Sequence, residues 1–343
     1  MSERPEGADR QVRSSAAIPG GRSLENAPAG SYLRRRLLRH WYWARTQGLS
    51  RLVEEDQLNP LTRIPTAVSK WWWRHANGVA PGAAVPVYLV GLQRSGTNML
   101  VRGLEASPEF EVHNENDNRA FCRFRLRSDA EVAAIVRRSR HRYVLFKPLC
   151  DSYRVDELLD ELPVPAAGRA IWAYRDVDGR ARSALAKFGD ANLQVLSEIA
   201  AGEGGQRWQA QRISERNREF IASFDYGDMS PQSAAALFWY VRNSLFFELG
   251  LDERDDVFLS SYDAMVGRPE ENMRALCRFL GFPWRSQLAA HIAPRPGSEK
   301  GRLDVDPRIR ARCDALRERL DATAAEQARR LTRDSEPFTS RPV

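Results

Sequence analysis

The chain alternates between short apolar runs and longer stretches in which apolar residues recur every three or four positions. Five of the short runs have the length and composition of buried strands, and they span residues 86–90, 110–113, 143–146, 170–174 and 257–260. The helical spacing lies between or after them, near residues 97–106, 129–139, 153–161, 178–187, 232–249, 269–280 and 303–333. Strands that alternate with helices predict an α/β fold of three layers, with a central parallel sheet of about five strands flanked by helices.

The same pattern divides the chain into parts. Residues 1–30 are rich in Gly, Pro, Ser and Arg, and we predict a disordered tail there. Residues 31–80 form a basic, aromatic helical arm, and residues 83–300 hold the main domain. Within that domain, residues 188–229 are polar and contain several glycines, which favours an insertion or a lid. Residues 303–335 are predicted to form a C-terminal helix packed on the domain.

Composition indicates a folded protein rather than a disordered or membrane-spanning one. Of the 343 residues, 43% are hydrophobic and 28% are charged, so the chain can bury a sizeable core. No run approaches the roughly 18 apolar residues of a membrane span. The first thirty residues lack the apolar stretch of a secretory signal, and the four cysteines lie far apart in the sequence. We therefore expect a cytoplasmic protein with reduced thiols and no metal site.

The net charge of +7 is concentrated near the N-terminus. Residues 1–80 contain 13 Lys or Arg and 7 Asp or Glu, so the rest of the chain is nearly neutral. This distribution argues against a nucleic-acid-binding core. The arm allows two interpretations: residues 31–78 contact the inner face of a membrane, or they form a helix that packs on the domain. The second is preferred because a basic amphipathic pattern alone is weak evidence for a membrane.

A glycine-flanked turn follows the first predicted strand and leads into a helix. Its sequence, Gly-Leu-Gln-Arg-Ser-Gly, runs from Gly91 to Gly96. Successive backbone N–H groups and the positive end of the helix suit such a turn for binding a phosphate. The glycine spacing is that of a nucleotide P-loop, but Thr97 and Asn98 stand where that loop has Lys and Ser or Thr. The fold is therefore P-loop-like, ATP and GTP are disfavoured, and Arg94 inside the loop suits one terminal phosphate-like group.

Further chemically distinctive residues follow the ends of other predicted strands. Lys147, one of only four lysines among 52 basic residues, ends one strand, and Glu115 follows another. Arg175 follows a third strand, and Ser183 lies eight residues later on a helix, which suits a guanidinium and a hydroxyl that bind one phosphate. Because the carboxyl ends of parallel strands share a rim where ligands bind, we expect these side chains to lie together.

The Arg-Ser-Gly-Thr of the loop, the spacing of Arg175 and Ser183, and the strand-end Lys147 resemble the sulfotransferases that use 3′-phosphoadenosine-5′-phosphosulfate (PAPS). The resemblance covers about residues 83–285 and implies a sulfotransferase domain. It implies that Lys147 contacts the bridging oxygen of PAPS and that Arg175 and Ser183 bind the 3′-phosphate. It also implies that the 5′-phosphosulfate is held by the loop residues Arg94, Ser95, Gly96, Thr97 and Asn98.

The same resemblance bears on the adenine and on the base that deprotonates the acceptor. A strand–helix unit that begins at Tyr262 is similar to one of the family, which implies a contact between Tyr262 and the adenine. Leu149 stands where a cytosolic subgroup has a histidine. In the tyrosylprotein branch a glutamate stands 21 residues after the loop arginine, and that position is Glu115 here. A carboxylate can take the acceptor proton; His113 is the alternative base, and a helix cap or an ion pair is the alternative role of Glu115.

The resemblance implies metal-independent, in-line transfer of a sulfuryl group to a hydroxyl acceptor such as a polysaccharide or glycolipid, with 3′,5′-ADP as the product. Two alternatives remain. A P-loop-type nucleoside or sugar kinase should have a loop lysine and an acidic magnesium ligand, and the lysine is missing. A non-catalytic, membrane-associated nucleotide-binding protein would leave Lys147 and Glu115 without a role. Arg180 and Arg182 are expected to be solvated surface charges.

Overall fold

The structure is a computed structural model, and it describes residues 60–205, 207–295 and 301–333. The predicted tail and most of the predicted arm lie outside these residues. The chain divides into two compact units, Met1–Ile64 and Pro65–Val343, and the second holds the sheet and the helices that cover it.

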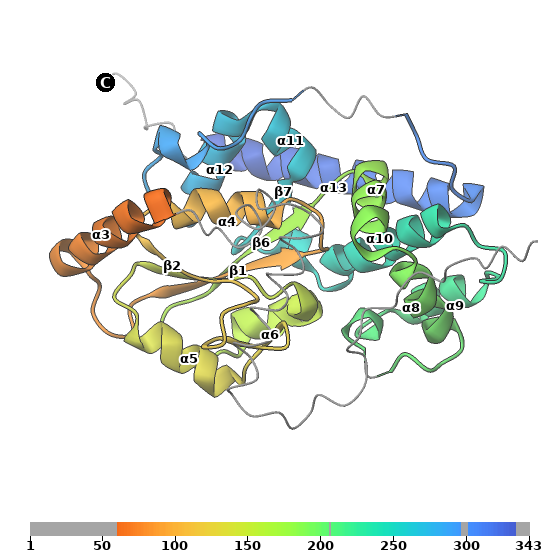
Figure 1. Cartoon of the computed structure of the whole chain (residues 1–343), viewed down its shortest axis with the longest axis horizontal. Helices are drawn as coiled ribbons and strands as arrows, with labels where there is room; N and C mark the ends of the chain where they lie inside the picture. The colour runs from red at the N-terminus through yellow and green to blue at the C-terminus, as the bar shows by residue number, and fades with distance from the viewer. Residues whose placement is uncertain (1–59, 206, 296–300, 334–343) are drawn as a thin grey trace, which may run out of the picture. The chain divides into compact units, whose positions relative to one another are not determined.

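Five strands form one parallel sheet in the order β2-β5-β1-β6-β7 (Figure 1). Their bounds are Val85–Gly91 for β1, Phe110–His113 for β2, Tyr143–Phe146 for β5, Arg169–Tyr174 for β6 and Val257–Ser261 for β7. Each bound lies within one residue of the predicted strand, so the predicted α/β fold with a central five-stranded parallel sheet is confirmed. A parallel sheet is buried on both faces, and each strand is therefore a continuous apolar run that is easy to find in the sequence.

β1 is the central strand, and the glycine-flanked turn follows its last residue. β1 pairs with β5 on one side, where Tyr88 lies opposite Phe146, and with β6 on the other, where Leu89 lies opposite Ile171. The chain first builds β2 and β5 on one side of β1, then crosses to build β6 and β7 on the other. In an open parallel sheet, such a switch point marks the crevice where ligands bind.

Helices cover both faces of the sheet (Figure 1). Val87 and Leu89 of β1 lie on one face, in an apolar cluster with residues of α4 (Thr97–Glu105), α11 (Tyr262–Gly267) and α12 (Pro269–Leu280). Tyr88 and Val90 lie on the other face. Their cluster includes residues of α5 (Asp129–Arg138), α6 (Val155–Asp160), α7 (Val177–Phe188) and α10 (Pro231–Glu248). Alternate residues of one strand thus hold three layers together, as the period of a strand requires.

Residues 188–229 are packed rather than extended. They contain α8 (Ala191–Ala200) and α9 (Glu215–Ala222), and Leu196 and Ile221 are fully buried in the same cluster as Tyr88. The glycines that favoured an insertion or a lid lie outside these helices, and two of the polar residues, Asn192 and Asn217, are buried. An insertion or lid here stays a prediction, but the segment contributes to the core of the domain.

α13 (Pro307–Arg333) covers the edge of the sheet at β7. Asp306 starts this helix, because its carboxylate accepts hydrogen bonds from the backbone N–H groups of Arg308, at 2.8 Å, and Ile309, at 3.3 Å. Near its other end, Gln327 meets the backbone of β7. Its amide nitrogen donates to the carbonyl of Val257 at 3.0 Å, and its amide oxygen accepts from the N–H of Leu259 at 2.8 Å.

A short hairpin and one further helix lie outside this sheet. The strands β3 (Phe121–Cys122) and β4 (Arg125–Leu126) form a short antiparallel hairpin that we did not predict. α3 (Pro60–Asn77) precedes the first strand, and none of the helices in the described part of the chain is long and apolar enough to cross a membrane.

Candidate functional site

The predicted site residues lie along one rim of the sheet. The loop follows β1, Glu115 stands two residues after β2, and Lys147 directly follows β5. Arg175 directly follows β6, and Tyr262 directly follows β7. All five strands are parallel, so their carboxyl ends share this rim.

The loop after β1 needs its glycines. Gly91 has φ +114°, and a Cβ atom there would lie 2.3 Å from the carbonyl oxygen of Ala173 on the neighbouring strand. Gly96 has φ +84°, and its Cβ would lie 2.4 Å from Cδ2 of the Tyr262 ring. Arg94 also adopts a positive φ, of +73°, although it has a side chain. Left-handed residues at 94 and 96 bend the backbone into a concave turn of the kind that binds anions.

The start of α4 offers hydrogen-bond donors to this turn. The helix begins at Thr97, its N-cap Gly96 gives no side-chain cap, and its first turn holds no acidic residue. The first N–H groups of a helix need partners, and together they carry partial positive charge. The Ser95 hydroxyl is buried and makes no hydrogen bond within the described residues. The backbone and Ser95 therefore present donors that suit an anion.

Arg94 joins the loop to α7. Its Nε donates to the Ser183 hydroxyl oxygen at 2.9 Å. We had placed Arg94 at the 5′-phosphosulfate and Ser183 at the 3′-phosphate, whereas here the two side chains are in direct contact. A side-chain hydrogen bond thus joins the loop to α7.

Arg180 is a residue of the site that the sequence analysis misjudged. The expectation of a solvated charge is wrong, because Arg180 is 1% exposed. Its Nε donates to the loop carbonyl of Gln93 and its Nη1 to the carbonyl of Ala235, both at 3.3 Å. Burial, together with the nearby charge of Arg94, lowers the pKa of Arg180 to about 9. The sequence position could have indicated this burial, because Arg180 stands three residues after the buried Val177 and so on the inward face of α7.

Its neighbour Arg182 is half-buried and donates to the carbonyl of Gly301, so it too is not a freely solvated charge. This contact brings the segment after the undescribed residues 296–300 against α7.

Arg175 lies over an aromatic ring. The centre of its guanidinium is 4.3 Å from the centroid of Tyr262, the same ring that closes on Gly96. Its Nε is buried and has no hydrogen-bond partner within the described part of the chain. The nearest carboxylate oxygen, on Asp176, is 3.9 Å from that nitrogen. Stacking on an aromatic face holds an arginine in place while its donors stay available for a ligand.

Two aspartates that the sequence analysis gave no role hold the backbone next to Arg175. The Asp176 carboxylate accepts from the N–H of Gly179 at 2.8 Å and so caps α7. The backbone N–H of Asp176 donates in turn to the Asp263 carboxylate at 2.7 Å. Burial and the charge of Asp176 raise the pKa of Asp263. These bonds fix the chain on both sides of the strand end that carries Arg175.

Lys147 connects the loop to a carboxylate. Its Nζ donates to Oδ1 of Asn98 at 2.7 Å and lies 3.3 Å from Oε2 of Glu115. Lys147 is 7% exposed, so its ammonium group is largely screened from water. Burial raises the pKa of Glu115, and the attraction of Lys147 partly opposes that rise. A cation and a carboxylate of raised pKa therefore stand side by side at the end of the loop.

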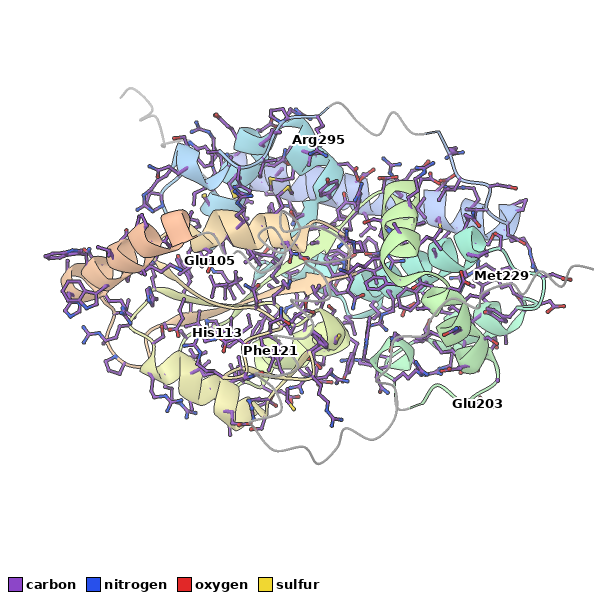
Figure 2. All side chains as sticks on the ribbon, viewed as in Figure 1. Glu105, His113, Phe121, Glu203, Met229 and Arg295 are labelled. Carbon is purple, nitrogen blue, oxygen red and sulfur yellow. The ribbon has the colours of Figure 1, made fainter. Side chains whose placement is uncertain are left out.

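His113, labelled in Figure 2, is held differently. Its Nδ1 lies 2.8 Å from the Asp117 carboxylate and its Nε2 lies 3.2 Å from that of Glu111. Burial disfavours its charged form, but the bonds to Asp117 and Glu111 outweigh burial and raise its pKa. Both ring nitrogens of His113 face carboxylates, so the geometry disfavours His113 as the alternative base and leaves Glu115 beside Lys147.

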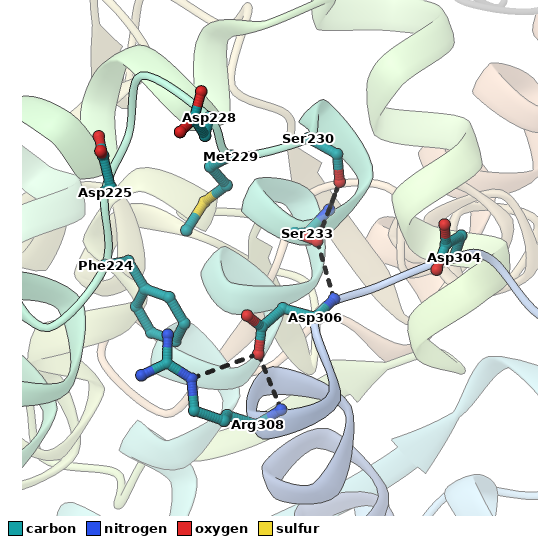
Figure 3. A pocket seen from close by; sticks show the side chains of 9 residues that line it. All are labelled: Phe224, Asp225, Asp228, Met229, Ser230, Ser233, Asp304, Asp306 and Arg308. Atoms are coloured by element: carbon teal, nitrogen blue, oxygen red, sulfur yellow. Dashed lines mark hydrogen bonds and ion pairs between the residues drawn. The ribbon is translucent and has the colours of Figure 1, made fainter.

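A pocket of about 350 Å³ lies elsewhere, where the segment after α9 meets the starts of α10 and α13 (Figure 3). Two of the polar residues that line it cap the neighbouring helices. Ser230 caps α10 by accepting from the N–H of Ser233 at 3.1 Å, and Asp306 caps α13. We therefore place the functional site at the loop and not at this pocket.

Comparison with known proteins assigns the chain to no family. No family model and no curated protein matches the sequence. The chain is similar to the crystal structure of a sulfotransferase from Alicyclobacillus acidocaldarius, with a TM-score of 0.37 and 16% identity over 73% of this chain and 95% of that chain. It is also similar to the sulfotransferase domain of the Synechococcus PCC 7002 olefin synthase, with a TM-score of 0.35 and 15% identity over the same shares. At these values the likeness carries no argument about function, which has to come from the residues of the site.

Proposed function

We propose that this protein transfers a sulfuryl group from PAPS to a hydroxyl acceptor, such as a carbohydrate or a glycolipid. The observation that carries the proposal is the position of the Lys147 ammonium, between Asn98 of the anion-binding loop and the Glu115 carboxylate. Sulfuryl transfer needs a cation at the leaving oxygen and a base at the attacking oxygen. The two groups stand 3.3 Å apart at the end of a loop that lacks a P-loop lysine.

Binding of the donor is divided between the loop and α7. The backbone from Ser95 to Asn98 and the Arg94 guanidinium hold the 5′-phosphosulfate. Arg175 and Ser183 hold the 3′-phosphate, which distinguishes PAPS from ATP. The direct bond between Arg94 and Ser183 places the two proposed anion sites beside each other. Tyr262, already stacked on Arg175, borders the nucleotide and is proposed to contact the adenine.

The reaction needs no redox partner. The acceptor oxygen forms a bond to sulfur while the bond from sulfur to the bridging oxygen of PAPS breaks. Glu115 takes the acceptor proton, and Lys147 stabilises the negative charge that grows on the departing 5′-phosphate oxygen of 3′,5′-ADP. By analogy with phosphoryl transfer, positioning and charge stabilisation account for most of the rate. No metal is required by this scheme.

A nucleotide-binding experiment separates the proposal from a kinase. We expect 3′,5′-ADP to raise the melting temperature in a thermal-shift assay, because a ligand that binds only the folded state stabilises it by mass action. ATP with magnesium should have a smaller effect, since the loop has no lysine for a phosphate chain. Stabilisation by ATP with magnesium and none by 3′,5′-ADP would contradict the proposal and favour the kinase.

A transfer experiment separates it from a non-catalytic nucleotide-binding protein. The purified protein is mixed with PAPS carrying labelled sulfate and with a lysate of the source organism, and the labelled product is identified. We expect label in a hydroxyl-bearing compound, and far slower labelling with the Lys147→Ala variant. Binding of 3′,5′-ADP without any transfer would favour a non-catalytic protein.

A further inference from the structure

Large apolar side chains that face solvent gather on one helix. Of the five exposed large hydrophobic residues within the described ranges, three lie on α3: Val68 is 50% exposed, Trp71 46% and Trp72 63%. Their spacing of three and four positions places them on one face of the helix. Single apolar residues are ordinary on a surface, but a contiguous set marks an interaction site.

The opposite face of α3 is turned toward the protein. Trp73 stacks on His141 with ring centroids 6.0 Å apart. Lys70, three positions earlier, shares that face, and burial lowers the pKa of Lys70 although Glu105 and Glu111 attract its charge. α3 therefore shelters a lysine while two tryptophans face outward. An amphipathic helix that only covers its own domain turns its apolar residues toward the domain and its charged residues toward solvent.

Exposed arginines lie beside the C-terminal end of α3. The N–H of Val79 donates to the carbonyl of Arg140 at 3.0 Å, which ties this end to the segment between α5 and β5. Five exposed arginines stand on α3, on the last turn of α5 and on this segment, namely Arg74, Arg137, Arg138, Arg140 and Arg142. Across the ranges that the structure describes, none of the five lies within 4.0 Å of a carboxylate, so the cluster is strongly positive.

We propose that this surface docks on an anionic lipid bilayer. The docking face consists of Val68, Trp71, Trp72 and the arginines Arg74, Arg137, Arg138, Arg140 and Arg142. Tryptophan prefers the boundary between lipid headgroups and acyl chains, and an apolar helix face beside basic residues is typical of interfacial binding. Each arginine near an anionic leaflet strengthens binding by roughly fivefold. A nucleic acid would match the arginines but would leave Val68 exposed to water.

The docking face lies at the end of the sheet away from the candidate active site. α3 and Arg142 precede the first residues of β1 and β5, whereas the loop follows the last residue of β1. β1 has seven residues, so its two ends are roughly 20 Å apart. A docked chain therefore keeps the rim with Lys147 clear of the bilayer. The inference concerns this face alone and does not depend on the proposed reaction.

The test uses the full chain and vesicle flotation at low salt. Vesicles of phosphatidylcholine with phosphatidylserine should carry the protein, and vesicles of phosphatidylcholine alone should not. The double variant Trp71→Ala/Trp72→Ala and the double variant Arg138→Glu/Arg140→Glu should each weaken binding about tenfold or more. Trp fluorescence of the wild type should shift to shorter wavelength with anionic vesicles, and the shift should shrink in the tryptophan variant.

Matched variants serve as controls. Phe124→Ala/Phe188→Ala removes the two other exposed large aromatics, and Arg216→Glu/Arg329→Glu makes the same change in charge at exposed positions of α9 and α13. Both should bind vesicles like the wild type. Absence of binding to anionic vesicles would overturn the proposal, and so would equal binding by all four variants. Tighter binding to a DNA oligonucleotide than to vesicles, insensitive to Trp71 and Trp72, would instead assign the surface to nucleic acid.

Discussion

At the scale of the residue, Lys147 shows how a buried charge can be stabilised. Its ammonium is largely screened from water, and it exchanges that water for an amide oxygen and a carboxylate. A lysine offers a compact charge on a flexible stem, which suits a group that has to follow a departing oxygen. In a chain whose basic residues are nearly all arginine, the choice of lysine here is itself a sign of function.

Replacing Lys147 by alanine should lower turnover about 10²- to 10³-fold, because a preorganised cation at the leaving oxygen acts mainly on the transition state. Affinity for 3′,5′-ADP should change little in the same variant, measured by calorimetry. Lys187→Ala, at the end of α7, is the matched control and should keep wild-type turnover. A Lys147→Ala enzyme as fast as the wild type would remove this residue from the mechanism.

The proposed base, Glu115, should determine how kcat/KM depends on pH. Burial raises the pKa of Glu115, and the group acts as a base only when it is deprotonated. We therefore expect kcat/KM to fall as the pH drops through a value above the ordinary 4.5 of a glutamate. Glu115→Gln should lower the rate by about 10²- to 10⁴-fold and remove this acidic limb.

The exposed Glu161→Gln should retain both the rate and the limb. A limb that persists in Glu115→Gln would show that another group is the base.

At the scale of the element, α7 organises the site. One turn of it carries the Asp176 cap, the next carries buried Arg180, and Ser183 follows on the side of the loop. The helix thus fixes the position of the loop through two hydrogen bonds. Arg180 donates to the carbonyl of Gln93, and Ser183 accepts from the side chain of Arg94. Anion binding here depends on two elements that are far apart in the sequence.

Two buried arginines allow a matched comparison. Arg180 and Arg242 are 1% and 3% exposed, and both donate to backbone carbonyls, but only Arg180 bonds to the loop. Arg180→Met should weaken binding of 3′,5′-ADP about tenfold or more, because a hydrogen bond from a charged donor is worth roughly 1.5–3 kcal/mol. Arg242→Met should lower the melting temperature yet keep the affinity. Equal affinities in the two variants would contradict the role of Arg180.

The sequence predicted the strands and the site residues on their ends better than it predicted what lies between them. Buried parallel strands are uniform apolar runs, so their bounds were found to within one residue, and the rim followed from the parallel order. The hairpin of β3 and β4 has two-residue strands, too short for a periodic signal. Arg180 was missed because arginine is rarely buried, so its type outweighed its place on the inward face of α7.

At the scale of the whole molecule, the ion cluster around His113 couples stability to pH. The pKa of His113 is raised, so its contribution is complete below the ordinary value of 6.5 and is lost as the pH rises through the folded value. Hydrogen bonds from His113 and Ser139 and the charge of His113 lower the pKa of Glu111 to about 2 despite its burial, so this contribution is lost as the pH falls from 4.5 toward 2. The cluster should therefore stabilise the fold most between about pH 4.5 and pH 6.5.

Urea unfolding across this range checks the expectation. The free energy of unfolding should decline above pH 6.5, by up to about 1.4 kcal/mol for each unit by which the folded pKa of His113 exceeds that value. His113→Gln keeps a hydrogen-bonding side chain but cannot be charged, so its decline should be smaller. The same decline in both proteins would show that other groups cause it.

The amide of Gln327 has a further effect on how copies of the chain behave in solution. β7 ends the sheet, and an open strand edge is a template on which another chain can add a strand. The two hydrogen bonds between Gln327 and β7 occupy a carbonyl and an N–H of that edge, and other residues of α13 pack against the same strand. A chain shortened to end before Pro307 would present this edge bare, and light scattering should then detect self-association that the full chain resists.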